Sequence, residues 1–270
     1  MDDLAPLVGT ELDLIRLDGH EDYPFLIRRD DQVIRPWVAT RGSWEPDLLS
    51  HVGSLLPEEP RIVVGGGHVG LSAFQLWRAR PRARELVVFE PHAVNAALLA
   101  LNVASWGASP VRTLPLALGV KTELLELASN PVNSADNRLW SSIPGELAAD
   151  GGDPERWPRR TVLAVALDDY WGERALDLLF LDTQGWEPDV LEGARRVIAH
   201  ARPLVVFEWW PRALVARNVD PELFLGWVER ELKLTLSAIG DTADVRRLTS
   251  RLLEDDDPTA YAELLAKPRW

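Results

Sequence analysis

A glycine-rich stretch directly follows a short apolar run in the first third of the chain. Gly65, Gly67 and Gly70 have the spacing Gly-x-Gly-x-x-Gly, with Gly66 and His68 between them. Glycine lets the backbone turn sharply and lets a ligand approach closely. The helix expected after this stretch presents free N–H groups at its start. We predict that the loop binds a cofactor at the carboxyl end of a strand.

An acidic residue closes the next apolar run. Glu90 follows residues 86–89 and precedes Pro91. A carboxylate at this position can accept hydrogen bonds from both hydroxyls of a ribose. Loop and carboxylate together indicate a cofactor that contains adenosine. They do not choose among such cofactors, because Gly65-x-Gly67-x-x-Gly70 also fits the fingerprint of flavin- and NAD-dependent oxidoreductases.

Two further acids end later apolar runs. Asp182 follows residues 176–181, and Glu208 follows residues 203–207. A carboxylate at a strand end can orient or deprotonate a hydroxyl group, and we predict that Asp182 is catalytic. Two neighbouring carboxylates could also hold a divalent metal. A paired-carboxylate role is favoured, and no metal is predicted.

Apolar runs alternate with helical patterns along most of the chain, which predicts an α/β fold with a parallel, doubly wound sheet. Runs that are apolar at every position fit a sheet covered on both faces. The expected strands are residues 12–17, 32–38, 62–64, 86–89, 111–116, 161–167, 176–181, 203–207, 233–239 and 261–266. The expected helices are residues 46–56, 70–79, 92–105, 187–200 and 221–232.

The stretch Asp182–Ala194 closely resembles the signature Asp-x-Glu/Gln-Gly-x-Glu-x-x-Val-Leu-x-Gly-Ala of the FkbM family of S-adenosylmethionine-dependent methyltransferases. Further blocks resemble the family in its own order, namely Val64–Gly70, Phe89-Glu90-Pro91, Asn102, Leu116–Gly119 and Leu167–Tyr170. The similarity covers roughly residues 40–266.

This resemblance implies a Rossmann-like class I methyltransferase sheet, seven-stranded and mostly parallel, with its last strand antiparallel. The cofactor it implies is S-adenosylmethionine, and the reaction is O-methylation of a hydroxyl on a small molecule such as a sugar or secondary metabolite. The residues expected to bind the cofactor are Gly65, Gly66, Gly67, His68, Gly70, Glu90, Pro91, Ala117 and Asp182.

Two positions depart from the family pattern. Val64 stands where the family usually has Asp, and His68 stands where it has Asn. An imidazole in the loop could approach the reacting groups, so His68 is a second catalytic candidate; a passive loop residue is the alternative. The loss of the acid at position 64 leaves open a non-catalytic binding protein with the same fold. An oxidoreductase is disfavoured because the block Asp182–Ala194 has no role in one.

The acceptor site is expected beside Asp182. Residues 133–138 resemble a polar Asn-x-Gly-Asp-x-Arg stretch seen in parts of the family, and tryptophan side chains could stack on an acceptor. The predicted acceptor-binding residues are Asn133, Asp136, Asn137, Arg138, Trp140, Gln184, Trp186, Glu187 and Glu208. We divide the chain into an N-terminal extension, residues 1–57, and a methyltransferase domain, residues 58–270, with an acceptor-side insertion at about residues 121–160.

Composition excludes several classes of protein. The chain of 270 residues has no cysteine, which excludes disulfides and thiolate chemistry. Its net charge of -13 disfavours nucleic acid as a partner. The first ten residues do not read as a secretory signal, and no apolar stretch is long enough to span a bilayer. We therefore expect a cytoplasmic protein. The sequence leaves the oligomeric state open, and a homodimer is one alternative.

Overall fold

A seven-stranded sheet forms the centre of the computed structural model, which describes residues 11–139 and 156–269. The strand order is β12-β13-β11-β10-β3-β4-β5. All pairs are parallel except those of β13, which is antiparallel to both of its neighbours. The predicted α/β class, the seven strands and the antiparallel last strand are confirmed. The strands are β3 (Arg61–Gly65), β4 (Glu85–Phe89), β5 (Val111–Leu114), β10 (Leu178–Leu181), β11 (Leu204–Trp209), β12 (Leu234–Ala238) and β13 (Ala262–Pro268).

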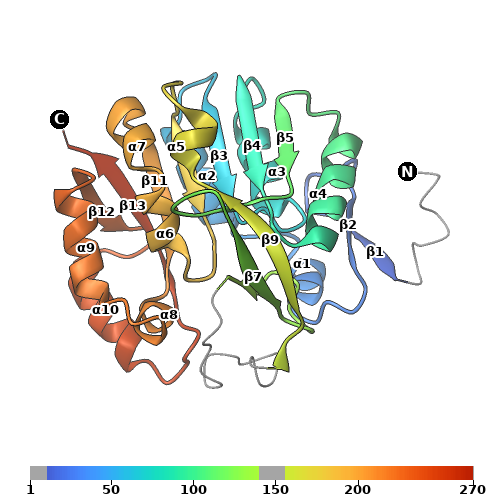
Figure 1. Cartoon of the computed structure of the whole chain (residues 1–270). Helices are drawn as coiled ribbons and strands as arrows, with labels where there is room; N and C mark the ends of the chain where they lie inside the picture. Colours follow the sequence, from blue (N-terminus) through green and yellow to red (C-terminus); the bar gives the residue numbers. More distant parts are fainter. Residues whose placement is uncertain (1–10, 140–155, 270) are drawn as a thin grey trace.

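Both faces of this sheet are buried. Successive side chains of a strand point to opposite sides, so the central strands contribute to the hydrophobic cores on both faces. Ile62 and Val64 belong to the hydrophobic core on one face, and Val63 belongs to the core on the other. Helices cover both faces (Figure 1). On the first face lie α2 (Pro46–Leu55), α3 (Leu71–Ala79) and α4 (Ala93–Trp106). On the second lie α5 (Leu167–Trp171), α6 (Glu187–Glu192), α7 (Arg195–Ala201), α8 (Pro211–Ala216), α9 (Pro221–Arg230) and α10 (Val245–Glu254).

The N-terminal residues form a hairpin and a helix. β1 (Leu12–Ile15) pairs with β2 (Phe25–Arg28), and α1 (Ile34–Arg41) follows. The prediction of a strand at residues 32–38 was wrong, because most of these residues belong to α1. The carboxylate of Asp31 accepts hydrogen bonds from the N–H groups of Val33 and Arg35, at 3.1 and 2.9 Å, which favours the start of a helix.

One buried amide joins this hairpin to α4 and to the glycine-rich loop by hydrogen bonds. The side chain of Asn102, fully buried in α4, accepts from Leu26 N–H at 2.7 Å and donates to the Leu26 carbonyl at 3.0 Å. It also donates to the Val69 carbonyl in the glycine-rich loop, at 2.8 Å. Residues 11–57 therefore pack on the core, while the boundary predicted at residue 57 stays a prediction.

A second sheet lies beneath the main one (Figure 1). Its order is β6-β9-β7-β8, and β9 contains most of the strand expected at residues 161–167. Part of the segment at residues 121–160, expected above to be an acceptor-side insertion, therefore forms strands. The strands are β6 (Ala117–Leu118), β7 (Glu123–Ser129), β8 (Asn137–Arg138) and β9 (Arg159–Val165).

The predicted helix at residues 187–200 is two helices, α6 and α7, with a break at Gly193. A Cβ atom added to Gly193 would lie 1.9 Å from the carbonyl oxygen of Gly119, so the chain turns where it touches the second sheet. The helices α1, α5, α8 and α10 were not predicted. Among the helices of the described ranges, none has the length and apolar character needed to cross a bilayer.

We expect Asn102→Ala to lower the free energy of unfolding by about 2–4 kcal/mol, because it leaves buried backbone groups of Leu26 and Val69 without partners. Chemical denaturation measures the change. Ser250→Ala, which removes one exposed hydrogen bond on α10, is the control and should change stability by less than about 0.5 kcal/mol. Equal stability of the Asn102 variant and the control would contradict the role of Asn102.

Candidate active site

The glycine-rich loop has the close contacts that require glycine. Gly66 has a φ of 84°, and a Cβ atom there would lie 1.7 Å from the carbonyl oxygen of Asp182. The N–H groups of Gly66 and Gly67 donate to the carbonyl of Phe89 at 3.0 and 2.9 Å. The loop is therefore fixed between the ends of β4 and β10, and a side chain at position 66 would separate it from β10.

Glu90 is the buried acid of this loop region. Its Oε2 accepts a hydrogen bond from the N–H of His68 at 2.7 Å, and its Oε1 accepts from the N–H of His92 at 2.8 Å. Burial raises the pKa of the Glu90 carboxyl to about 7, against the two backbone hydrogen bonds, which lower it. Near neutral pH this carboxyl therefore titrates, and a ligand that prefers the ionised form would lower its pKa.

A first hollow opens above this loop at the carboxyl ends of β3, β4 and β10. It has about 560 Å³ of empty space, part of which is open to solvent. Predicted residues that line it are Gly66, His68, Glu90, Pro91, Ala117, Asn137, Asp182 and Gln184. The apolar remainder of its wall is Phe89, Leu116, Leu118, Leu127, Ala135 and Leu139, with Thr183 beside them.

A second hollow, of about 1160 Å³ including open solvent, adjoins the first. The two share Ala135, Asp182 and Gln184, so these residues stand where the hollows meet. Its wall combines carboxylates with aromatic rings. The residues are Val33, Ile34, Trp37, Trp44, Glu45, Asn133, Ala135, Asp136, Arg138, Asp182, Gln184, Glu208, Trp210, Thr259 and Tyr261.

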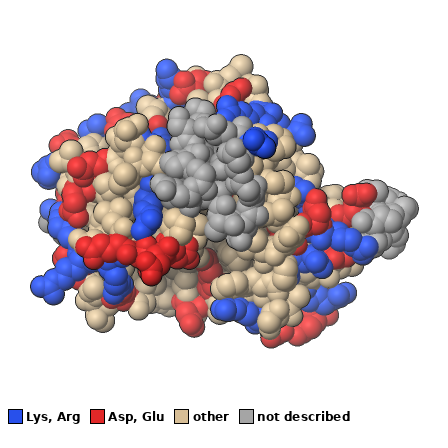
Figure 2. Space-filling view, turned by 90° about the horizontal axis from the view of Figure 1, so that it is seen from below, with Lys and Arg blue, Asp and Glu red and all other residues tan. Residues whose placement is uncertain are grey.

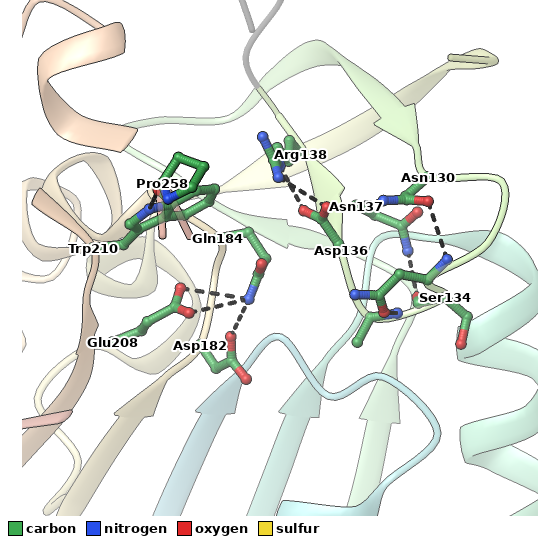
Figure 3. A network of polar contacts seen from close by, with 12 residues as sticks. Asn130, Ser134, Asp136, Asn137, Arg138, Asp182, Gln184, Glu208, Trp210 and Pro258 are labelled. Carbon is green, nitrogen blue, oxygen red and sulfur yellow. Dashed lines mark hydrogen bonds and ion pairs between the residues drawn. The ribbon is translucent and has the colours of Figure 1, made fainter. Parts of the chain in front are cut away.

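Asp182 and Glu208 lie on either side of one amide (Figure 3). The Gln184 amide donates to Asp182 Oδ1 at 2.7 Å and approaches the two oxygens of Glu208 at 3.5 and 3.4 Å. Burial raises the pKa of the Asp182 carboxyl to about 6 and raises that of Glu208 well above its usual value, where the charge of Asp182 adds to the effect. At pH 7 Asp182 is mostly ionised and can accept a proton.

His68 is held in a buried chain of hydrogen bonds. Its Nε2 lies 2.7 Å from Ser134 Oγ, and that hydroxyl donates to the carboxylate of Asp31. Because the hydroxyl has a single proton, His68 Nε2–H must be the donor to Ser134. Burial lowers the pKa of His68 to about 4, so its ring is neutral at pH 7. This ring therefore joins the loop to the N-terminal residues through Nε2.

Other predicted site residues lie outside the two hollows. A Cβ atom on Gly67 would lie 2.3 Å from Val88, and one on Gly70 would lie 2.8 Å from Trp106, so these glycines serve packing. Gly65 is buried at the end of β3. Trp140 lies outside the described residues.

Two predicted acceptor-binding side chains also have structural contacts. Glu187 is 1% exposed, and its Oε1 accepts from the N–H and the hydroxyl of Thr183 at 2.8 and 2.7 Å, which fixes the turn after Asp182. The ring of Trp186 has the guanidinium of Arg217 over it at 4.1 Å.

The sequence reasoning missed the walls of the second hollow that come from both ends of the chain. Trp37, Trp44 and Glu45 come from α1 and the residues before α2, and Thr259 and Tyr261 precede β13. The Tyr261 hydroxyl donates to Glu45 Oε1 at 3.3 Å, across 216 positions of sequence. No local pattern signals such a contact; only the αL conformation of Glu45, with φ of 41°, marks it as unusual, and this needs the structure.

Val64 lies inside the core on the first face of the sheet and is fully buried. Its neighbours in register are Val88 and Phe180. An apolar side chain thus fits this place without leaving a buried charge. Among the described residues, the carboxylates that line the first hollow are those of Glu90 and Asp182.

Comparisons with known proteins find similar structures. The crystal structure of the methyltransferase FkbM from Methylobacillus flagellatus KT is similar with a TM-score of 0.53 and 15% identity, over 83% of this chain and 48% of that one. This chain thus spans about half the length of that structure. The O-methyltransferase TomG from Streptomyces achromogenes, in complex with SAM, has a TM-score of 0.47 and 17% identity over 84% of this chain and 80% of that one. No curated protein matches the sequence.

The sheet order and the site at its carboxyl edge define a class I methyltransferase fold. The model of the methyltransferase FkbM domain matches residues 65–228, more than half of the chain, and the chain belongs to this family. Its cofactor is S-adenosylmethionine. The first hollow has groups suited to that cofactor, namely a buried acid at Glu90 and an apolar wall. Membership of a methyltransferase family argues against the oxidoreductase alternative.

We expect Gly66→Ala to weaken binding of S-adenosylhomocysteine by about tenfold or more, about 1.4 kcal/mol. The new Cβ would lie 1.7 Å from the Asp182 carbonyl oxygen, so the loop must move away from β10. Calorimetric titration measures the affinity. Gly240→Ala is the control, because Gly240 has a similar φ of 75° and no atom within 4 Å of the added Cβ. Affinities that agree within error for the wild type and both variants would refute this account of the loop.

Proposed function

We propose that this methyltransferase methylates a hydroxyl group of a small molecule bound in the second hollow. The observation that carries the proposal is the position of Asp182, which lines both hollows. A group transferred from a cofactor in one hollow to an acceptor in the other must pass this junction. S-adenosylmethionine supplies an electrophilic methyl group on its sulfonium sulfur.

The residues of the first hollow would hold the cofactor. Glu90 is placed to accept hydrogen bonds from a ribose, and Gly66 lines the hollow beside it. The apolar side chains of Leu118 and Leu139 offer a surface for an adenine ring. Asn137 and Gln184 add polar groups to the wall.

Asp182 would orient the acceptor hydroxyl and take its proton. In-line displacement requires the oxygen to be held on the side of the methyl group opposite the sulfur, and this positioning supplies most of the acceleration. With a pKa of about 6, the Asp182 carboxyl is ionised at pH 7 and still accepts a proton. Gln184, which donates to Asp182 at 2.7 Å, fixes the orientation of that carboxylate. The neutral ring of His68 is assigned a positioning role in the loop.

A protein that binds the cofactor without catalysis is the second candidate, raised by Val64. The buried, apolar setting of Val64 removes the reason to expect a defect there. Incubation with radiolabelled S-adenosylmethionine and a panel of hydroxylated acceptors separates the candidates. Labelled product whose methyl group is shown by NMR to be on oxygen supports the proposal. Methyl transfer to nitrogen or carbon alone would contradict it.

Glu90→Ala should weaken binding of S-adenosylhomocysteine by about 100-fold, the loss of about 3 kcal/mol of charge-assisted hydrogen bonds. In the wild type the affinity should fall as the pH drops below about 7, because the carboxyl, whose pKa is raised, becomes protonated and accepts hydrogen bonds less well. Titrations between pH 6 and 8 test both points, with Glu254→Gln, an exposed site on α10, as the control. Wild-type affinity in Glu90→Ala would remove Glu90 from the site.

Asp182→Asn should lower kcat by about 100-fold or more and leave affinity for S-adenosylhomocysteine within about threefold. At saturating cofactor, kcat/KM of the wild type should rise with pH up to about 6 and then level, because Asp182 must be ionised. This rise should be absent from the variant. A fully active Asp182→Asn enzyme would exclude the residue from proton removal.

A further inference from the structure

The second hollow holds more negative than positive charge. Four carboxylates line it, those of Glu45, Asp136, Asp182 and Glu208, and one guanidinium, that of Arg138. The guanidinium of Arg138 donates two hydrogen bonds, of 2.5 and 2.8 Å, to the carboxylate of Asp136, so the charges of these two side chains compensate each other. Three carboxylates remain, and the contacts found for them among the described residues are with neutral groups.

Among the described residues that line this hollow, Arg138 is the one basic side chain. Residues 140–155 contain no lysine, arginine or histidine, and neither do residues 2–10. Glu263 stands directly opposite Glu208 in the register of β13 and β11, which adds a further acid behind the hollow. Two like charges at directly opposed positions destabilise a sheet unless a cation or a proton compensates. The net charge of the chain is -13, and a band of acidic side chains lies on the side of α9 and α10 (Figure 2).

Aromatic rings form the other part of the wall. Trp37, Trp44, Trp210 and Tyr261 line the hollow. Two of them already bind cations on one face, since Arg41 lies 3.7 Å from the ring centre of Trp37 and Arg138 lies 4.7 Å from that of Trp210. Rings near carboxylates are the usual surroundings of an organic ammonium group, which the ring faces attract.

Resting on the function proposed above, we infer that the acceptor carries a cationic nitrogen, a protonated amine or a quaternary ammonium, which binds in the second hollow between Glu45, Glu208 and the aromatic wall. Its hydroxyl then lies at Asp182, where the hollows meet (Figure 3). The cationic nitrogen has no lone pair and is not methylated, so the methyl group goes to oxygen. An anionic acceptor would be repelled by these acids. A cationic acceptor would favour the ionised forms of Glu45 and Glu208, whose pKa values burial raises, and would act as their counterion.

A divalent metal is the other cation that carboxylates attract. Aromatic rings are not ligands for such an ion. Within residues 11–139 and 156–269, no group of three or more histidine, aspartate or glutamate side chains has the arrangement of a metal site. The wall of the hollow therefore favours an organic cation.

The test uses two probes that differ in charge and agree in shape and in their hydroxyl group. Choline and 3,3-dimethyl-1-butanol are titrated separately into the full-length protein saturated with S-adenosylhomocysteine, in buffer with EDTA, and binding is followed by tryptophan fluorescence and by ligand-observed NMR. We expect choline to bind about tenfold or more tightly than the neutral alcohol, which corresponds to about 1.4 kcal/mol. Equal affinity for both probes would overturn the inference.

Matched variants locate the site. Glu208→Gln and Glu45→Gln, which keep the shape of each side chain, should each weaken choline binding by about fivefold or more and leave binding of the neutral alcohol unchanged. Glu254→Gln, an exposed acid on α10, removes the same charge elsewhere and should have no effect. If all three variants weakened choline binding equally, the affinity would depend only on the overall charge of the protein, and the proposed site would be overturned. Melting temperatures confirm that each variant is folded.

Different outcomes would contradict the cationic acceptor and the proposed function. If S-adenosylhomocysteine does not bind, the proposed function fails, and the choline titration is repeated without it, because the second hollow is built largely from other residues. If S-adenosylhomocysteine binds and methyl transfer occurs only to neutral acceptors, the function stands and the cationic acceptor is refuted. If Mg²⁺ in the absence of EDTA displaces choline one for one, the hollow is a metal site, and the inference is overturned.

Discussion

The close contact between Gly66 and the backbone of Asp182 is the constraint on which the rest of the site depends. β3 and β10 are neighbours in the sheet, and both end at this contact, so any side chain at position 66 would push the loop away from β10. The loop also holds His68 above the sheet, where its N–H reaches the carboxylate of Glu90. A position without a side chain thus sets the distance between Glu90 in the first hollow and Asp182, which lines both hollows.

The acids that line the two hollows are energetically unfavourable for the fold by themselves. Glu90, Asp182, Glu45 and Glu208 lie where burial raises their pKa values, and the contacts found for them are mainly with neutral donors. A structure selected for stability alone would pair or replace such groups, because an uncompensated buried charge is strongly unfavourable. Perturbed carboxyls gathered along one opening are instead typical of a functional site, where ligands complete the charge balance.

The main sheet could be predicted from the sequence because its central strands, β3, β4, β10 and β11, are mostly apolar and are separated by helical patterns. The glycine loop, Glu90 and Asp182 could be found for a related reason, since each ends such a strand. The second sheet was not predicted, because β7 mixes Glu123 and Glu126 with a leucine, Leu124, that is 70% exposed. α1 was taken for a strand because Val33, Ile34 and Val38 are β-branched, and the helix depends on Asp31, which also binds Ser134 about a hundred positions away. The aromatic wall could not be predicted, because its residues meet only in three dimensions.

The two hollows are made from different stretches of the chain. The first is built between residues 66 and 184, whereas the second takes much of its wall from residues 33–45 and 208–261. Substitutions in residues 33–45 or 208–261 can therefore alter the second hollow while the first keeps its shape. Among the described residues, Ala135, Asp182 and Gln184 line both hollows, so the shape of the second hollow can diverge between relatives while the middle of the chain keeps the first one constant.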